Sequence, residues 1–324
     1  MEPVLRVQDL TVSYDSVDRR SLTILDGVSF EIAAGEAIGL LGESGCGKST
    51  LALSLLNLLP SSARIVRGSV MLAGVDLLKL SDRELHKVRG ARVSIVHQEP
   101  GAALNPVMRA GEQIAQVLRA HEPVSRSRAR EEAINLLLQL GFTSESRVWD
   151  AYPHQLSGGQ QQRVAIAQAI ACRPSLLIAD EPTTALDTET QAEILGLLRS
   201  LREKLGLAVL LISHDPEVVE SFADRVLVMY AGRVVEEGTT GQVMRQALHP
   251  YTQGLLRCRL SGERRRGQRR PLETIAGDSP DFAHLPAGCS FEDRCPDRMQ
   301  VCRTCRPALF QPGDRQVACF KYAP

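Results

Sequence analysis

The sequence predicts an α/β fold in which a mostly parallel sheet is covered by helices on both faces. Short apolar runs of strand length alternate with longer segments whose apolar residues recur at helical spacing, which is typical of parallel sheets. The clearest strands are 37–41, 93–96, 176–179 and 207–212. A glycine-rich loop follows the first of them, and a helical stretch from about 107 to 152 forms an insert within the α/β frame.

Composition and charge restrict the class of protein. The 324 residues suffice for one large or two unequal domains. Lys and Arg number 38 and Asp and Glu number 38, and this balance argues against a dedicated nucleic-acid binder. The first ten residues alternate like a strand and unlike a signal peptide, and no run of about 18 apolar residues could cross a membrane. We therefore expect a protein that stays in the cytoplasm, or at the membrane face through a partner.

A small β-rich part is expected around the first main strand. Short strands are predicted at 4–12 and 28–32, and residues 64–80 alternate again before a helix that starts near Ser81. Tyr14 follows the first of these strands. The sequence alone favours an aromatic side chain at the sheet edge, and the alternative is a flat surface on which adenine stacks.

The loop after strand 37–41 reads Gly42-Glu43-Ser44-Gly45-Cys46-Gly47-Lys48-Ser49-Thr50. This is the spacing of a P-loop, in which glycines allow successive N–H groups and the positive helix end to face one anion. Lys48 would reach the outer phosphates and Ser49 would ligate Mg²⁺. A turn that serves packing alone is the alternative. The following helix is expected to run to Leu59, before Pro60.

Polar residues follow three of the later strands, at the edge where such a sheet holds its ligand. They are Gln98, the pair Asp180-Glu181, and His214. Two adjacent carboxylates at the exit of an apolar strand are costly to bury without a cation. Mg²⁺ for Asp180 and a water for Glu181 would resolve that cost.

A second anion site is expected at Ser157-Gly158-Gly159-Gln160, where a helix-like run begins. Further along, a helix is predicted from Thr188 to Leu205, closed by Gly206, and a hairpin of 226–230 and 233–236 is expected to be the last sheet element.

The C-terminal part changes composition. An arginine-rich polar stretch between 259 and 270 reads as a solvated linker in preference to a lipid or nucleic-acid contact. Five of the eight cysteines follow between 289 and 319. Because so short a segment forms little hydrophobic core by itself, a bound metal ion that stabilises it is a reasonable expectation. The two-residue spacing between Cys302 and Cys305 suits zinc. Unligated thiols in a docked tail are the alternative.

Across residues 4–240 these motifs, in this order, resemble the ATP-binding subunit of an ABC transporter. The shared features are the P-loop, Gln98, Leu156-Ser157-Gly158-Gly159-Gln160, Asp180-Glu181, Ala185-Leu186-Asp187 and His214. The resemblance narrows to the oligopeptide/dipeptide importers and their nickel-uptake relatives at four further places: Leu104-Asn105-Pro106-Val107, Tyr152-Pro153-His154-Gln155, His249-Pro250-Tyr251-Thr252-Gln253-Gly254-Leu255-Leu256 and the cysteine tail.

The resemblance implies a P-loop NTPase core of the ABC type, with a β-subdomain and a helical subdomain at about 100–155. This domain would span 1–258, and a linker with a small cysteine-rich C-terminal domain would span 259–324. It also implies a head-to-tail dimer, homomeric or heteromeric, in which the P-loop of one subunit and Ser157-Gly158-Gly159 of the other close over one ATP.

The resemblance also implies a role for each site residue. Glu181 polarises the attacking water, His214 holds the γ-phosphate and Gln98 links Mg²⁺ and water to the membrane partner. Tyr14 becomes the adenine platform, which reverses the preference from sequence alone for an edge aromatic. The implied ATP contacts are Tyr14, Gly42, Ser44, Gly45, Gly47, Lys48, Ser49, Thr50, Ser157, Gly158, Gly159 and Gln160, and the implied Mg²⁺ contacts are Ser49, Gln98 and Asp180.

The expected function is ATP hydrolysis coupled to uptake of di- and oligopeptides. The partners would be two transmembrane permease subunits, docked between Gln98 and the helical insert, and an extracytoplasmic substrate-binding protein, with the chain peripheral on the cytoplasmic face of the plasma (inner) membrane. Nickel or another small solute is the alternative cargo. Two alternative functions come from other functional classes. One is a soluble ABC ATPase that acts on nucleic acid or ribosomes, and the other is a nucleotide sensor without turnover.

The tail resembles that of peptide-importer ATPases, some of which hold a [4Fe–4S] cluster on four cysteines. Matched to this chain, those ligands are Cys289, Cys295, Cys302 and Cys319. Zn²⁺ remains the alternative, and Cys305 lies outside the matching four.

Overall fold

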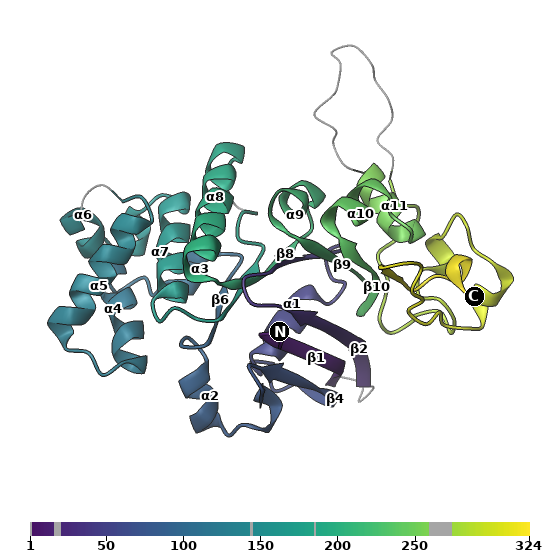
Figure 1. Cartoon of the computed structure of the whole chain (residues 1–324), viewed down its shortest axis with the longest axis horizontal. Coiled ribbons are helices and arrows are strands. Elements are labelled where there is room, and N and C mark those ends of the chain that lie inside the picture. The colour runs from purple at the N-terminus through teal and green to yellow at the C-terminus, as the bar shows by residue number, and fades with distance from the viewer. Residues whose placement is uncertain (1, 16–20, 143–144, 185, 259–273) are drawn as a thin grey trace, which may run out of the picture. The chain divides into compact units, whose positions relative to one another are not determined.

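The computed structural model describes residues 2–15, 21–142, 145–184, 186–258 and 274–324 (Figure 1). The predicted arginine-rich linker and Ala185 lie outside these residues. The chain forms two compact units, which are described separately. Unit 1 is Met1–Arg6, Glu31–Ala37 and Met71–Ile212, and unit 2 is Val7–Phe30, Ile38–Val70 and Ser213–Pro324.

The core of unit 1 is a parallel sheet. Strands β6 (Val93–Val96), β7 (Leu176–Asp180) and β8 (Ala208–Ser213) pair in parallel, so the prediction of parallel strands is confirmed here. β7 and β8 are buried along their whole length, which explains why their sequences are continuous apolar runs.

Helix α8 (Thr188–Leu205) has the limits that the sequence predicts. The Asp187 carboxylate accepts a hydrogen bond from the Thr190 N–H (2.9 Å) and caps the start of the helix. Gly206 ends it with φ of 64°, a conformation that glycine adopts without strain.

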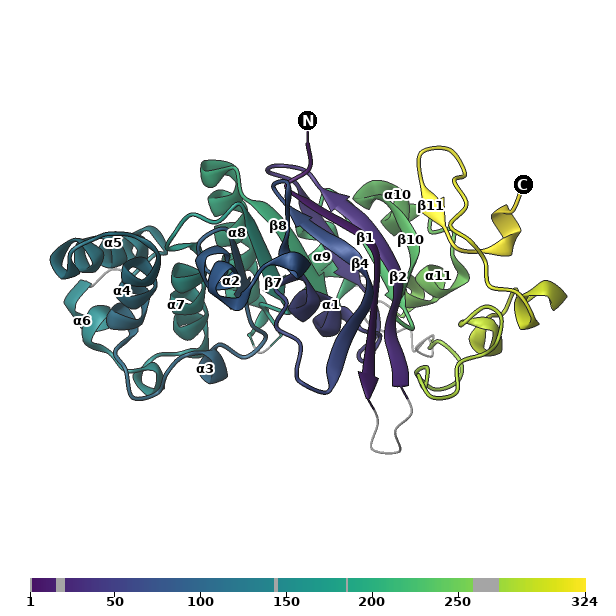
Figure 2. The same cartoon turned by 90° about the horizontal axis from the view of Figure 1, so that it is seen from below.

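The predicted helical insert is present in unit 1 and consists of several helices (Figures 1 and 2). They are α3 (Pro100–Ala103), α4 (Ala110–His121), α5 (Arg126–Gln139) and α6 (Glu145–Asp150), followed by α7 (Gly158–Ile170). α4 and α6 approach closely, because a methyl group added at Gly111 would overlap the ring of Trp149. The Arg130 guanidinium lies 5.0 Å from the centre of the same ring.

The sheet of unit 2 contains β3 (Ala37–Leu41), which pairs in parallel with β9 (Arg225–Tyr230). β9 and β10 (Arg233–Thr239) form the predicted hairpin. The hairpin is not the last sheet element, and this part of the prediction was wrong. The two-residue strand β11 (Gln316–Val317) pairs with β10, and so short a strand carries no periodic pattern in the sequence.

A separate four-stranded sheet has the strand order β2-β1-β4-β5. Its strands are β1 (Leu5–Asp15), β2 (Ser21–Ile32), β4 (Ala63–Leu72) and β5 (Val75–Asp76). The strand expected at 28–32 is therefore the end of a longer one. The 3₁₀ turn η1 (Leu77–Lys79) then leads to α2 (Asp82–Val88), and Ser81 and Glu84 form the capping box at its start.

Helix α1 (Lys48–Leu55) is shorter than expected. The sequence predicts that it continues to Leu59, but Asn57 has φ of 50°, in the left-handed region, and the helix ends before it. Proline was the wrong stop signal, because the chain leaves the helix several residues earlier.

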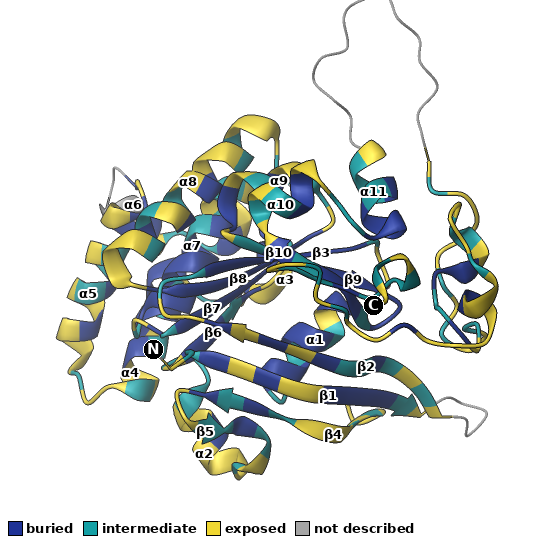
Figure 3. Cartoon of the chain, turned by 45° about the vertical axis from the view of Figure 1, so that its right-hand side comes forward, coloured by how far each residue is buried: buried dark blue, intermediate teal, exposed yellow. Residues whose placement is uncertain are grey.

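The rest of unit 2 comprises helices and the tail. The helices are α9 (Pro216–Phe222), α10 (Thr240–Arg245) and α11 (Pro250–Arg257), and the tail holds the 3₁₀ turns η3 (Glu292–Arg294), η4 (Gln300–Arg303) and η5 (Phe320–Tyr322). Phe291 from the tail packs in the core of unit 2, with its ring centre 5.1 Å from that of Tyr230 and 5.4 Å from that of Tyr251. Figure 3 shows β3 and β9 buried in the same unit.

The buried side chains of Glu236 and His249 form hydrogen bonds between β10 and the start of α11. The Glu236 carboxylate of β10 accepts hydrogen bonds from the N–H groups of Leu248 (2.8 Å) and His249 (2.9 Å). His249 is 2% exposed, and its Nδ1 accepts from the Tyr251 N–H (3.0 Å). Burial lowers the pKa of His249 to about 4, so this histidine is neutral at physiological pH.

Among the helices that the structure describes, none has both the length and the apolar character needed to cross a bilayer.

Candidate functional site

The predicted P-loop connects β3 to α1 in unit 2, as a strand, a loop and a helix. Gly47 caps α1 with φ of 108°, and a methyl group added at Gly42 would overlap the Met229 carbonyl oxygen and lie 2.7 Å from Cys46 Sγ. Both positions therefore require glycine, one for its backbone conformation and the other for space. The sequence motif is thus built into a tightly packed turn.

Lys48 lies beneath this loop. Its side-chain nitrogen donates to the carbonyl oxygens of Gly42 (2.8 Å) and Glu43 (2.9 Å), and the residue is 6% exposed. Ser44 and Gly45 at the loop apex and Ser49 in the first turn of α1 are exposed. An anion at the apex would therefore meet exposed backbone N–H groups and the start of a helix, with one ammonium close by.

Two other predicted residues belong to unit 2. His214 is exposed and precedes α9, whose first turn is capped by the Asp215 carboxylate accepting from the Glu217 N–H (2.8 Å). Tyr14 lies near the end of β1 and is half-buried. Their contacts with a nucleotide remain predictions.

In unit 1 the structure brings Gln98 and Glu181 together. Gln98 Nε2 donates to Glu181 Oε2 (3.2 Å), across 83 residues of sequence. The Thr184 hydroxyl donates to the same oxygen (2.9 Å). Thr184 was missed by the sequence reasoning, although its place three residues after Glu181, in the same turn, is a local signal that could have found it.

The backbone at Glu181 is unusual. Its φ is 47°, in a region that costs a non-glycine residue of the order of 1–3 kcal/mol. The Glu181 N–H donates to the Ile212 carbonyl (2.9 Å), so the pairing of β7 with β8 extends into the turn and holds it. Asp180, the preceding residue, ends β7 and is 8% exposed. The backbone therefore leaves the extended conformation of β7 at Glu181.

The second predicted anion site is the start of α7. Ser157 and Gln160 form a capping box, in which Ser157 Oγ accepts from the Gln160 N–H (3.3 Å) and Gln160 Oε1 accepts from the Ser157 N–H (3.0 Å). Ser157, Gly158 and Gln160 are exposed, and Gly159 is half-buried. The helix start is therefore formed and accessible from outside unit 1.

The predicted site residues are thus distributed over both units. Unit 2 contributes the P-loop, Tyr14 and His214, and unit 1 contributes Gln98, Ser157-Gly158-Gly159-Gln160 and Asp180-Glu181.

The predicted metal ligands of the tail are not arranged as a metal site. Within the described ranges, no group of three or more His, Cys, Asp and Glu side chains could hold a metal ion. Burial, with the neighbouring thiols as lesser contributors, raises the pKa of Cys289 and of Cys295 to about 11. Neutral thiols behave as small apolar groups, and these two pack against the core of unit 2. Cys305 is exposed.

Comparison with known proteins relates both parts of the chain to one transport system. Residues 25–184 match the ABC transporter family, and residues 235–302 match the C-terminal region of oligopeptide/dipeptide transporters. The oligopeptide transport ATP-binding protein AppD of Bacillus subtilis is 44% identical, over 99% of this chain and 98% of its own length. The chain belongs to the oligopeptide/dipeptide family of ABC transporter ATP-binding proteins.

Other relatives agree with this assignment. OppD of Escherichia coli, also an oligopeptide transport ATP-binding protein, is 43% identical over 99% of this chain and 94% of its own length. Among solved structures, a dimer of the ATP-binding cassette MJ0796 bound to ADP and Pi is 32% identical with a TM-score of 0.66. It covers 73% of this chain and 98% of its own. The predictions of an ABC ATPase fold and of ATP hydrolysis that drives transport are therefore confirmed.

Proposed function

We propose that this ABC ATPase energises the import of di- and oligopeptides, with Glu181 as the residue that activates water. The hydrogen bond from Gln98 to Glu181 is the observation that supports the site best, because it brings together two polar residues that follow different strands of one parallel sheet. The peptide cargo rests on relatives named for oligopeptide transport and on the match of the C-terminal region.

Each side chain has a proposed part in hydrolysis. Lys48 binds the outer phosphates, the N–H groups of the P-loop bind the phosphate oxygens, and Tyr14 stacks on adenine. Glu181 orients the attacking water and draws off its proton, while His214 binds the γ-phosphate. Gln98 and Thr184 fix the Glu181 carboxylate through the hydrogen bonds to its Oε2.

The oxygen donors present fit Mg²⁺. The Asp180 carboxylate is buried at the end of an apolar strand, and the Ser49 hydroxyl is exposed at the start of α1. With the amide oxygen of Gln98, these are the ligand types that Mg²⁺ prefers. The ion would neutralise charge on the phosphates during hydrolysis.

We further propose that a second ATPase subunit, identical or homologous, completes the site with its own Ser157-Gly158-Gly159. The start of α7 supports this, because Ser157, Gly158 and Gln160 are exposed there at the N-terminus of a helix. The related MJ0796 cassette, solved with ADP and Pi bound, is itself dimeric. Closure on ATP and opening after hydrolysis would drive the partner permeases.

The permeases are proposed to dock on the helical part of unit 1, with the chain peripheral on the cytoplasmic face of the membrane and a substrate-binding protein on the other side. A cavity of about 950 Å³ opens among Val107, Arg130, Trp149 and nearby residues of α4 and α5. Val107, the last residue of a family-like motif, is 82% exposed. Val107→Asp should reduce recovery of the membrane subunits and leave ATP binding unchanged.

The metal in the tail remains a proposal that stands on resemblance. It is supported by the pKa of Cys289, which is raised first by burial and further by the nearby thiols of Cys302, Cys295 and Cys319. Because the arrangement seen is not a ligand set, no step of hydrolysis is assigned to it. Iron and acid-labile sulfide in anaerobically purified protein would support a [4Fe–4S] cluster, zinc alone would support the alternative, and neither would remove the proposal.

Membrane recovery tests the transport function. A tag on this chain should bring down two multi-span subunits, and short peptides presented with the binding protein should stimulate ATP hydrolysis by the complex. Stimulation by nickel and not by peptides would transfer the assignment to the nickel branch. Recovery with nucleic acid and no membrane protein would refute it.

A further inference from the structure

Glu43, the residue after the first P-loop glycine, is held from three directions. Its N–H donates to the Tyr251 hydroxyl of α11 (2.8 Å), and its carbonyl oxygen accepts from Lys48 Nζ (2.9 Å). Its carboxylate accepts from two nitrogens of Arg294, with distances of 2.7 and 2.9 Å. Arg294 lies 251 residues away, in the cysteine-containing tail. One residue therefore connects the P-loop lysine to the C-terminal region.

Arg294 itself is fixed in place. Its side chain is 7% exposed, and its Nε donates to the Ala276 carbonyl (3.0 Å). Its guanidinium lies 5.8 Å from the ring centre of Tyr230 and 6.0 Å from that of Phe291, both in the core of unit 2. A planar two-pronged contact of this kind is strong and directional, and lysine does not reproduce it.

Because Glu43 lies in the P-loop, its ion pair with Arg294 affects nucleotide binding. The Glu43 side chain is 21% exposed, and it belongs to the loop that binds a polyanion. A carboxylate there repels phosphate unless its charge is compensated, and a partly buried charge is poorly screened by solvent. Arg294 supplies the compensating charge from outside the motif.

We propose that Arg294 is a positioning residue for nucleotide binding, which neutralises and orients Glu43 and thereby sets the affinity of the P-loop for phosphate. The C-terminal region is then part of the nucleotide-binding apparatus and not only an appendage to it. The proposal concerns ATP binding and is independent of the transported cargo.

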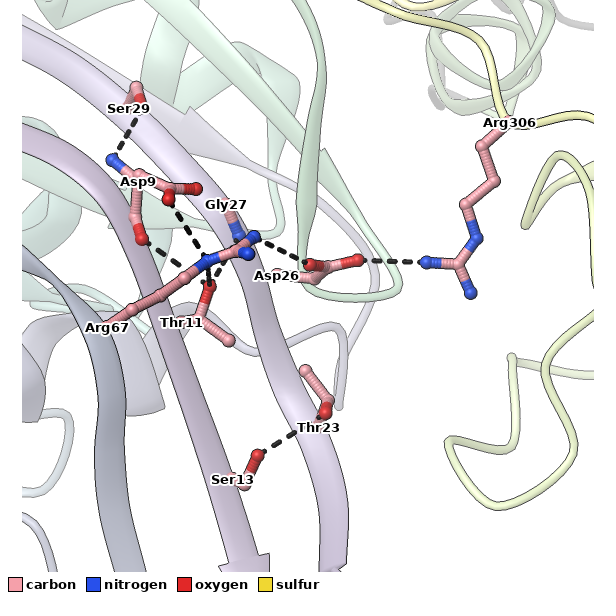
Figure 4. Close-up of polar contacts among 9 residues, drawn as sticks. All are labelled: Asp9, Thr11, Ser13, Thr23, Asp26, Gly27, Ser29, Arg67 and Arg306. Atoms are coloured by element: carbon pink, nitrogen blue, oxygen red, sulfur yellow. Dashed lines mark hydrogen bonds and ion pairs between the residues drawn. The ribbon is translucent and has the colours of Figure 1, made fainter.

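The chain provides a matched control. Arg306, also in the tail, forms an ion pair with Asp26 of β2 (3.0 Å), as Figure 4 shows. Like Arg294, it links the tail to the N-terminal part of unit 2, but its partner is outside the P-loop. Arg306→Gln therefore reports the effect of losing one such link without altering the charge at the loop.

The experiment measures dissociation constants of ATP, ADP and adenosine, by competition with a fluorescent nucleotide, together with melting temperatures. Arg294→Gln should weaken ATP binding about tenfold, which is the order of magnitude expected for one uncompensated charge near the phosphates. The penalty should be smaller for ADP, absent for adenosine, and reduced by salt. The double variant Glu43→Gln/Arg294→Gln should return to within about twofold of wild type, because it leaves no unpaired carboxylate.

A purely structural link predicts a different result. Arg294→Gln would then lower the melting temperature as Arg306→Gln does, with ATP affinity within twofold of wild type, and this outcome would overturn the proposal. An equal penalty for ATP and adenosine would overturn it as well.

If Arg294→Gln does not fold, the Glu43→Gln variant and the double variant carry the test. Glu43→Gln leaves the Arg294 charge unopposed and should bind ATP several-fold more tightly than the double variant. Equal affinities of these two variants would refute the proposal.

Discussion

Replacing Glu181 with glutamine should separate ATP binding from ATP hydrolysis. Both hydrogen bonds described at this carboxylate, from Gln98 Nε2 and from the Thr184 hydroxyl, end on the single oxygen Oε2. The amide oxygen of glutamine can replace that oxygen and keep both contacts. The substitution then removes the basic carboxylate and keeps these two contacts, so the turn at Glu181 and the binding of ATP should be retained.

The size of the effect follows from the role of a general base. Such a group contributes about 10²- to 10⁴-fold to the rate, which corresponds to about 3–5 kcal/mol of activation free energy. Phosphate release in a single turnover, measured at saturating ATP, should therefore fall by at least a hundredfold, while the dissociation constant of ATP changes less than threefold.

Glu189→Gln is the matched control for this prediction. Glu189 is an exposed acid in the first turn of α8, eight residues after Glu181, and its replacement should leave turnover unchanged. Turnover of Glu181→Gln within threefold of wild type would refute the assignment of the base. A loss of ATP binding equal to the loss of turnover would show that the residue supports the fold of the site instead.

Three further predictions concern the fold around the site. Gly42→Ala should weaken ATP binding at least tenfold and destabilise the protein by about 1–3 kcal/mol, because the added methyl overlaps the Met229 carbonyl oxygen. Gly196→Ala in α8, where an added methyl meets no described atom within 4 Å, should stabilise the protein by about 0.5–1 kcal/mol. Urea unfolding measures both stabilities, and equal effects of the two substitutions would contradict the packing argument. Gly111→Val should lower the melting temperature through its clash with Trp149 and leave the affinity for ATP unchanged in a binding titration. Burial lowers the His249 pKa from its ordinary 6.5 to about 4, so the unfolded chain binds the proton first as the pH falls through this interval, and the free energy of unfolding should drop by up to about 3 kcal/mol. In urea unfolding between pH 6.5 and 4.5, His249→Gln should show a shallower drop than the wild type. The same dependence of the unfolding free energy on pH in both proteins would be the opposing result.

Features with a local cause could be predicted from the sequence. Strand β3, the P-loop and α1 are adjacent in the chain, and the glycines needed for the turn are visible in the motif. Helix α8 was predicted with its correct limits, because its apolar residues recur at helical spacing and the terminating Gly206 is a local signal. The sequence also placed Gln98 and Glu181 after two strands of the sheet, and the structure adds that these strands are neighbours and that the two side chains meet.

Features that depend on distant contacts could not be predicted. The pairing of β11 with β10 joins residues about 80 positions apart and has no periodic pattern. The ion pair between Glu43 and Arg294 joins two charges of common types, and nothing near either residue identifies the other. The end of α1 was misplaced because Asn57 adopts a left-handed conformation, which its sequence neighbourhood does not specify. The spacing of the tail cysteines predicted a metal site, but within the described ranges no such group of side chains could hold a metal ion, because a spacing does not determine side-chain geometry.

The most direct measurement is ATP-driven uptake of a labelled oligopeptide by proteoliposomes that contain the complex recovered through this chain. We predict uptake with wild-type protein, and none above background with Glu181→Gln, although that variant still binds ATP. Uptake by the Glu181→Gln complex at the wild-type rate, or steady ATP consumption by the wild-type complex with no peptide transported, would contradict the account.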